Sequence, residues 1–232
     1  SIHDTKILDN ISFSVNEGEI FGIVGESGSG KSMTALGLMK LLPDGAKMTG
    51  AVTLSEIDLS KISEEKMCSL RGNAISMIFQ EPMTALNPVQ TIGNQVAETL
   101  IIHGQAKRSE ALRVAREKLN RVGLTAKQFP LSKYPHELSG GQRQRVAIAL
   151  AIAMRPQILI ADEPTTALDV TTQSQILKLL KSLVDEEKMA LILITHDLAV
   201  VSGLANNVAV MQNGEIVEAG KTKDVFHHMK HE

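Results

Sequence analysis

The chain has 232 residues, of which 43% are hydrophobic, so it can bury the core of one large domain or of two small ones. Its formal net charge of −2 argues against nucleic acid as a primary partner, because nucleic-acid-binding domains usually carry a basic surface. The single cysteine, Cys68, excludes an internal disulfide and a cysteine-cluster metal site. The longest apolar run, Val146 to Met154, is too short to cross a bilayer, so we expect any membrane role to pass through a partner.

The first part of the chain is predicted to be rich in strands. Apolar residues alternate with polar ones towards the end of Ile7 to Val15, as in a half-buried strand, and Ile20 to Val24 is an apolar run typical of a buried strand. Lys31 to Leu42 then carries apolar residues at helical intervals. Further strands are predicted over Val52 to Leu54 and Ala74 to Phe79.

A glycine-rich loop separates the strand that ends at Val24 from the following helix. It has the pattern G-x-x-x-x-G-K-[ST] and consists of Gly25, Glu26, Ser27, Gly28, Ser29, Gly30, Lys31 and Ser32. The glycines let backbone N–H groups point into one concave nest for phosphate, while Lys31 reaches the outer phosphates and the Ser32 hydroxyl can bind magnesium. A flexible glycine linker is the alternative, but buried elements would not bracket a linker. The loop, with Met33 after it, is therefore predicted to bind a nucleotide triphosphate.

The middle of the chain has a helical pattern. Ile92, Val96 and Leu100 recur every four residues, and a second amphipathic helix stops at Gly123, a residue type favoured just after a helix C-terminus. The apolar residues that mark the second helix are Leu112, Ala115, Leu119 and Val122. We therefore expect a helical insertion over about residues 82–155.

The last third of the chain alternates strands and helices again. Ile158 to Ala161 and Leu191 to Thr195 are near-continuous apolar runs with an amphipathic helix between them. Buried strands separated by helices are typical of a parallel sheet that is covered on both faces. A hairpin is predicted for Val208 to Met211 and Glu215 to Glu218, because the Asn213-Gly214 pair between them is a favoured turn.

Two carboxylates, Asp162 and Glu163, follow the strand that ends at Ala161. Because parallel strands deliver their C-terminal ends to one crevice, Asp162 is expected to lie near Ser32 and a bound magnesium ion. Glu163 is then placed to orient or deprotonate a water that attacks the γ-phosphate. The alternative is a pair of acidic residues that cap the next helix, although a cap needs only one carboxylate.

A second glycine-rich segment, Leu138-Ser139-Gly140-Gly141-Gln142, precedes a helix. Ser139 and Gln142 also fit a capping box, so a simple helix cap is a real alternative. The N–H groups, the hydroxyl and the positive end of the helix dipole would together make another anion site. Because the first loop already holds the chain's own nucleotide, this segment makes most sense if it closes on a nucleotide held by another subunit.

The motifs occur in the order and approximate spacing of an ABC transporter nucleotide-binding domain, which the chain resembles over nearly its whole length. They are the glycine-rich loop, Gln80 in Phe79-Gln80-Glu81-Pro82, the signature Leu138 to Gln142, Asp162-Glu163, Ala167-Leu168-Asp169 and Thr195-His196-Asp197. The resemblance implies an α/β fold, with a P-loop NTPase parallel-sheet core, an N-terminal antiparallel β subdomain and an inserted helical subdomain. Residues 1–81 and 156–232 would form the RecA-like core with its antiparallel β part, and about 82–155 the helical subdomain that carries the signature.

The resemblance also implies ATP and Mg²⁺ as cofactors and roles for single residues. Gln80 would contact the magnesium ion, together with Ser32 and Asp162, and would contact the attacking water. His196 would contact the γ-phosphate and steady the catalytic carboxylate or the water, and Asp169 would cross a dimer interface. Without the other motifs, the glutamine would be an ordinary polar residue at a strand end and the histidine a helix cap.

Subunits of this family pack head to tail, so that each glycine-rich loop faces the other subunit's signature across an ATP. The tracts Gln80 to Pro88 and Tyr134 to Ser139 resemble the ATPases of oligopeptide, dipeptide and nickel importers. This implies a second ABC ATPase subunit, transmembrane permease partners, an extracytoplasmic solute-binding protein that acts indirectly, and a location on the cytoplasmic face of the membrane. A surface-exposed Met83 or Leu86 would serve to dock a permease helix. Pairing with a second copy or with a paralogue stays open.

Two features depart from the family pattern. The aromatic residue that stacks on adenine has no counterpart, because its position falls on Ile2, beside His3. His227, His228 and His231 could bind nickel or zinc, but a histidine-containing terminal helix or tail is favoured. The alternatives to an importer subunit are a non-transport ABC ATPase and a regulatory partner that binds ATP without hydrolysing it.

Overall fold

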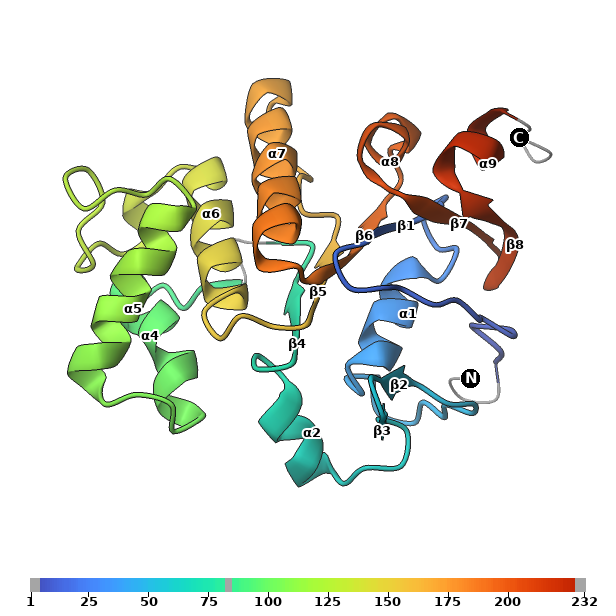
Figure 1. Cartoon of the computed structure of the whole chain (residues 1–232), viewed down its shortest axis with the longest axis horizontal. Helices are drawn as coiled ribbons and strands as arrows, with labels where there is room; N and C mark the ends of the chain where they lie inside the picture. Colours follow the sequence, from blue (N-terminus) through green and yellow to red (C-terminus); the bar gives the residue numbers. More distant parts are fainter. Residues whose placement is uncertain (1–4, 82–84, 228–232) are drawn as a thin grey trace.

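A six-stranded sheet forms the centre of the computed structural model, which describes residues 5–81 and 85–227 (Figure 1). In spatial order its strands are β4 (Ile75–Ile78), β5 (Ile158–Asp162), β6 (Ala190–Thr195), β1 (Ile20–Gly25), β7 (Asn207–Gln212) and β8 (Glu215–Lys221). The first five run parallel, and β8 pairs antiparallel with β7. The parallel core and the terminal hairpin are therefore as the sequence predicts.

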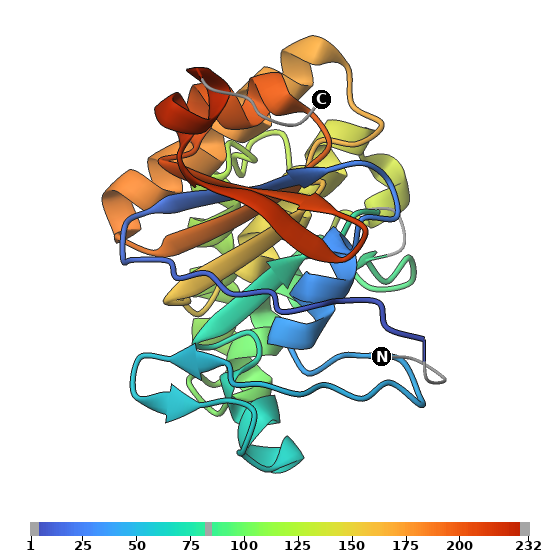
Figure 2. The ribbon, with the colours of Figure 1, turned by 90° about the vertical axis from the view of Figure 1, so that its right-hand side faces the viewer.

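Alternate side chains of the buried strands pack into two different cores. Leu191 and Leu193 belong to the apolar cluster that contains the helices on one face of the sheet, including α7 (Val170–Glu187). Ile192 and Ile194 belong to a second cluster, on the face covered by α1 (Lys31–Leu38). Near-continuous apolar strands are required because both faces of the sheet are covered (Figure 2).

The helices between β4 and β5 gather on one side of the molecule (Figure 1). They are α4 (Ile92–Ile102), α5 (Arg108–Arg121), the single 3₁₀ turn η1 (Pro135–Glu137) and α6 (Gly140–Ala151). The predicted apolar positions point inward, and Val96, Ala115 and Val146 are fully buried. Gly123 adopts φ of +85° just past the end of α5, where a glycine closes a helix without steric cost.

The predicted strand over Ile7 to Val15 is wrong, since residues 6–15 form no strand in the structure. The alternating pattern nevertheless corresponds to alternating burial. Ile11, Phe13 and Val15 are half-buried, and the residues between them are exposed. Phe13 stacks on Phe21 of β1 with ring centroids 5.0 Å apart. The pattern indicates which side chains face the core, but it does not indicate whether a neighbouring strand is available for a hydrogen-bonded ladder.

The antiparallel part of this region is a small hairpin of β2 (Thr53–Leu54) and β3 (Ile57–Asp58). A hollow of about 1190 Å³ lies between the N-terminal segment, α1 and the amino ends of β4, β5 and β6. The predicted nucleotide-binding residues lie at the carboxyl ends of these strands, so this hollow is not the candidate site.

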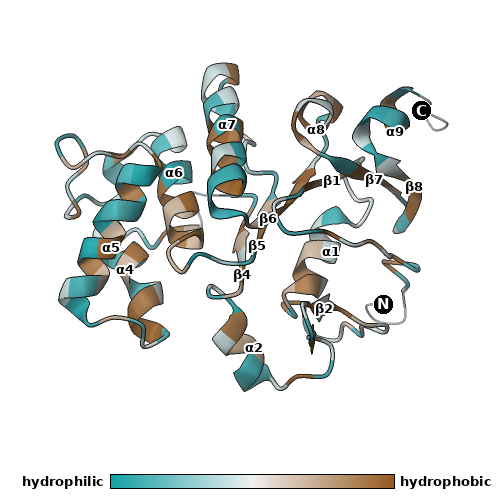
Figure 3. Cartoon of the chain, viewed as in Figure 1, coloured by the Kyte–Doolittle hydropathy of each residue, from teal (hydrophilic) through white to brown (hydrophobic). Residues whose placement is uncertain are grey.

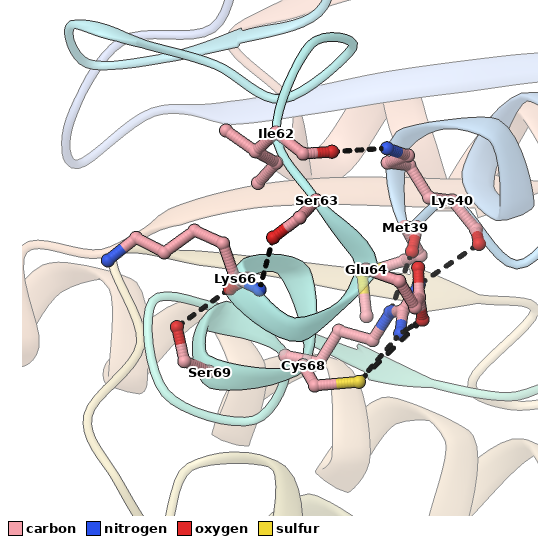
Figure 4. A network of polar contacts seen from close by, with 9 residues as sticks. Met39, Lys40, Ile62, Ser63, Glu64, Lys66, Cys68 and Ser69 are labelled. Atoms are coloured by element: carbon pink, nitrogen blue, oxygen red, sulfur yellow. Dashed lines mark hydrogen bonds and ion pairs between the residues drawn. The ribbon is translucent and has the colours of Figure 1, made fainter.

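Two short helices, α2 (Glu64–Leu70) and α8 (Leu198–Leu204), were not predicted. A third, α9 (Thr222–His227), contains the first histidine of the favoured terminal helix or tail. Arg71, at the end of α2, donates from Nε to the carbonyl of Met39 (2.8 Å) and from Nη2 to that of Lys40 (3.0 Å), and it forms an ion pair with Glu64 (Figure 4). A guanidinium at a helix C-terminus is favourable for the helix dipole. Arg71 thus anchors the end of α1 that lies away from the glycine-rich loop.

The central strands β1 and β6 are mostly apolar, whereas the β7–β8 hairpin, α5 and α7 show hydrophilic stretches (Figure 3). Among the described residues, no helix combines the length and the hydropathy that a membrane crossing requires.

Candidate nucleotide site

The glycine-rich loop joins β1 to α1 in the order that phosphate binding requires. Gly30 is the N-cap of α1 with φ of +102° and no side-chain cap, so the first N–H groups of the helix have no capping acceptor. A Cβ on Gly25 would lie 2.1 Å from the backbone oxygen of Met211, so only glycine fits between β1 and β7. The loop is therefore a nest of backbone donors with a helix N-terminus at one end.

Lys31 is folded back onto its own loop. Its Nζ donates to the carbonyl oxygens of Gly25 (2.8 Å) and Glu26 (2.7 Å). Burial lowers the pKa of Lys31, and the negative charges of Glu163 and Asp162 oppose this effect. The two carboxylates are thus near enough to act on the loop lysine, as the crevice argument predicts.

Asp162 ends β5 with its side chain almost fully buried, and its Oδ1 has no hydrogen-bond partner. Burial raises the pKa of Asp162, while the Ser32 side chain and the charge of Lys31 act in the opposite direction. A buried, unpartnered carboxylate oxygen beside a hydroxyl is the donor chemistry that Mg²⁺ prefers. Because the described residues contain no cluster of three or more His, Cys, Asp or Glu side chains, a metal here would depend on this mixed set of oxygens.

Two of the three predicted catalytic residues, Gln80 and His196, contact the carboxylate of the third, Glu163. Glu163 Oε2 accepts from Gln80 Nε2 (3.1 Å) and from Thr166 Oγ1 (2.9 Å), and Oε1 lies 3.1 Å from His196 Nδ1. Burial works to raise the pKa of Glu163, but hydrogen bonds from His196 and Thr166 outweigh it and hold that pKa below its usual value. Gln80, Glu163 and His196 follow β4, β5 and β6, so the carboxyl edge of the sheet assembles them.

The signature segment begins α6. Ser139 is the N-cap: its Oγ accepts from Gln142 N (3.3 Å), and Gln142 Oε1 accepts from Ser139 N (2.9 Å). The capping box that the sequence offered as the alternative is therefore present. A Cβ on Gly141 would lie 2.5 Å from Thr172 Cγ2 of α7, so the glycine permits close packing of the two helix starts. Among the described residues, the signature makes no hydrogen bond to the glycine-rich loop.

Asp169 is exposed and is the N-cap of α7. Its Oδ1 accepts from Thr172 N (2.9 Å) and its Oδ2 from Thr172 Oγ1 (2.7 Å). Hydrogen bonds from the backbone and the side chain of Thr172 lower the pKa of Asp169. The carboxylate thus stays charged on an open surface, next to the signature.

The sequence profile described as "ABC transporter" matches residues 8–166. The chain belongs to the ABC transporter family. The motif resemblance is thereby confirmed, and the sheet and helix arrangement agrees with the fold that the family implies.

Two curated relatives of this ABC family member are ATP-binding proteins of importers or transporters. The glutathione import ATP-binding protein GsiA of Escherichia coli (strain K12) is 50% identical over 229 residues, which cover 96% of this chain and 37% of GsiA. The oligopeptide transport ATP-binding protein AppD of Bacillus subtilis (strain 168) is 49% identical over 221 residues, 94% of this chain and 67% of AppD. The chain therefore spans well under half the length of GsiA and about two thirds of AppD.

Two solved structures share the fold. One is the ATP-binding cassette MJ0796, in a dimeric post-hydrolysis state bound to ADP and Pi, which superposes with a TM-score of 0.80 and 32% sequence identity. The matched region covers 93% of this chain and 90% of the MJ0796 chain. The other is the cbiO1 protein from Clostridium perfringens, part of the ABC transporter complex cbiONQ, with a TM-score of 0.81 and 29% sequence identity. The matched region covers 97% of this chain and 85% of the cbiO1 chain.

Some predictions for this ABC family member need correction or lie outside the described residues. Leu86 is buried, with 4% of its surface exposed, so it is not the exposed docking residue that the sequence suggested. Of the described residues between 79 and 90, Phe79 and Val89 are the large apolar ones that are exposed. The remaining predicted positions that the structure does not describe are Ile2, His3, Met83, His228 and His231.

Sequence reasoning did not single out Thr166, although its hydroxyl touches the predicted catalytic carboxylate. The available signal was the Glu-Pro-Thr-Thr tract, because proline after Glu163 favours a β-turn that returns the fourth residue to the first.

Proposed function

We propose that the chain is the ATP-binding and ATP-hydrolysing subunit of an ABC importer that takes up peptides or nickel. The observation that carries the proposal is the convergence of Gln80, Glu163 and His196 on one point beside the glycine-rich loop. The relatives AppD, an oligopeptide transport ATP-binding protein, and GsiA, a glutathione import ATP-binding protein, favour a peptide as cargo.

The residues of the site divide the work of phosphoryl transfer. Lys31 and the free N–H groups of α1 would bind the phosphates, and Ser32, Asp162 and Gln80 would hold Mg²⁺, which neutralises charge on the phosphate oxygens. Glu163 would orient the attacking water and take its proton. His196 would fix the carboxylate from the other side, as its contact with Oε1 already does.

We further propose that two subunits share two nucleotides. The glycine-rich loop of one subunit would face Ser139 to Gln142 of the other, and Asp169 would reach across the interface. Residues 82–155 would act as the helical subdomain that presents the signature. ATP binding would close this dimer and hydrolysis would reopen it, driving permease subunits fed indirectly by a solute-binding protein, with the chain on the cytoplasmic face of the membrane.

The test is Glu163→Gln in the assembled transporter, with phosphate release and ATP binding both measured. Removing the base while keeping the side-chain shape should lower turnover by about 100-fold or more, leave ATP binding intact and favour the closed dimer. Glu56→Gln, the same change at an exposed residue in the turn between β2 and β3, is the control and should leave turnover unchanged. Undiminished phosphate release by Glu163→Gln would remove Glu163 from its role.

A further inference from the structure

Thr166 contacts Glu163 twice, through its backbone and through its side chain. The N–H of Thr166 donates to the carbonyl of Glu163 (3.2 Å), which closes a turn with Pro164 at its second position. The Oγ1 of Thr166 donates to Oε2 of the same residue (2.9 Å). The turn therefore returns a hydroxyl to the carboxylate that begins it.

The backbone around this turn has a fixed and unusual shape. Glu163 has φ of +45° and Ala167 has φ of +62°, a region that costs a residue with a side chain about 1–3 kcal/mol. The N–H of Glu163 donates to the carbonyl of Ile194 in β6 (2.9 Å), which ties the strained residue to the sheet. Thr166 thus lies on a turn between two left-handed residues, and the residue that begins this turn is hydrogen-bonded to the sheet.

The hydrogen bonds of Glu163 leave one acceptor position open. An ionised carboxylate has about four lone-pair sites, and three are used here: two on Oε2 by Gln80 and Thr166, and one on Oε1 by His196, whose Nδ1 must then carry the proton. The fourth, on Oε1, has no partner among the described residues. It is the position from which a water could be held.

We propose that Thr166 is a positioning residue that fixes the rotation of the Glu163 carboxylate, so that its open lone pair faces the attacking water. The proposal rests on the proposed ATP hydrolysis. The terminal torsion of a glutamate is broad and does not fix the carboxylate plane by itself. The plane is set by the donors around it, and of these donors only Thr166 lies on the hydrogen-bonded turn that begins at Glu163.

Thr166 is suited to this role because it is uncharged. The charged or titratable groups that face Glu163 are His196, Lys31 and Asp162. Replacing the threonine hydroxyl leaves all of them in place, so a change in rate would reflect orientation and not a change in the charge of the site.

The test compares three variants in the assembled transporter. Thr166→Val keeps the branched shape and removes the hydroxyl, and Thr166→Ser keeps the hydroxyl. Thr165→Val makes the same substitution next door, at a hydroxyl that does not contact Glu163 in the described structure. We expect kcat to fall about 10-fold in Thr166→Val, with KM for ATP within twofold of wild type. Thr166→Ser should keep at least half the wild-type kcat, and Thr165→Val should match wild type.

A second readout does not depend on the steady-state rate. After rapid removal of free nucleotide, Thr166→Val should retain more intact ATP relative to ADP than wild type does, as Glu163→Gln should. Adding Thr166→Val to Glu163→Gln should change the residual rate by less than twofold, because residues that act through one group are not additive. Thr166→Ala serves as a second hydroxyl-free variant should the valine fold poorly.

Several results would overturn the proposal. An equal fall in kcat in Thr165→Val and Thr166→Val would indicate a general effect on the loop. A raised KM, or no trapped ATP in Thr166→Val, would indicate a role in binding or in dimer contact. The proposed function fails separately, if wild type and Glu163→Gln release phosphate at the same rate.

Discussion

The two glycine-rich helix starts of this molecule look alike in sequence but differ in how their N–H groups are used. At α1 the N-cap is Gly30, which offers no side chain, and the first turn contains no acidic residue. At α6 the N-cap is Ser139, which exchanges hydrogen bonds with Gln142 in a complete capping box. The first start is open to a ligand, whereas the second has satisfied part of its own donors.

This difference suggests a division of labour between the two segments. The α1 start can bind phosphate without help, and Lys31 meanwhile occupies the loop carbonyls. The α6 start is preformed by its capping box, and we propose that its remaining donors gain a partner when a nucleotide is brought to it. Such an arrangement fits a site shared between two subunits.

The largest expected effect is on ATP binding at the start of α1. Lys31→Ala removes the cation that faces the phosphates, and charge-assisted hydrogen bonds contribute about 1.5–3 kcal/mol each. We therefore expect ATP binding by the isolated chain, measured by calorimetry, to weaken about 10- to 150-fold.

Lys61→Ala is the control, because Lys61 is exposed and its ion pair is with Asp58 (2.8 Å), at the end of β3. It should bind ATP as wild type does. Unchanged affinity in Lys31→Ala would show that the α1 start does not bind through this lysine.

A smaller effect is expected on stability at the start of α6, where two adjacent glycines differ in their surroundings. A Cβ on Gly141 would meet Thr172 Cγ2 at 2.5 Å, whereas a Cβ on Gly140 would meet Leu168 at an ordinary 3.7 Å. Gly141→Ala should lower the free energy of unfolding by about 1–3 kcal/mol through overpacking. Gly140→Ala should stay within about 1 kcal/mol of wild type.

Urea unfolding of the isolated chain measures both values. Thr172→Ser removes the methyl group that the new Cβ would meet, so it should recover stability in the Gly141→Ala background. Equal stability of the two alanine variants would contradict the close packing of α6 against α7.

The sequence predicted most of the sheet, because its buried strands are apolar runs that end in recognisable motifs. β5 and β6 agree with the predicted runs within one residue at either end. The short helices α2 and α8 were missed because helices of seven residues carry too few apolar positions to show a period.

Other errors have a common physical reason. A local sequence pattern does not specify which distant part of the chain its residues will contact. The alternation over Ile11 to Val15 indicated burial but not a missing ladder neighbour. Leu86 turned inward where a surface role was expected. Thr166 reached Glu163 through a turn, a contact that depends on three-dimensional geometry and not on spacing alone.

The central claim is that each ATP site needs two subunits. The most direct measurement is the rate of ATP hydrolysis per subunit as a function of subunit concentration, with association followed in parallel by light scattering; for a mixed pair, the partner subunit is titrated instead. We predict a rate near zero for the single subunit that rises with the dimer fraction to a plateau. A constant rate per subunit, with the protein monomeric throughout, would contradict the account.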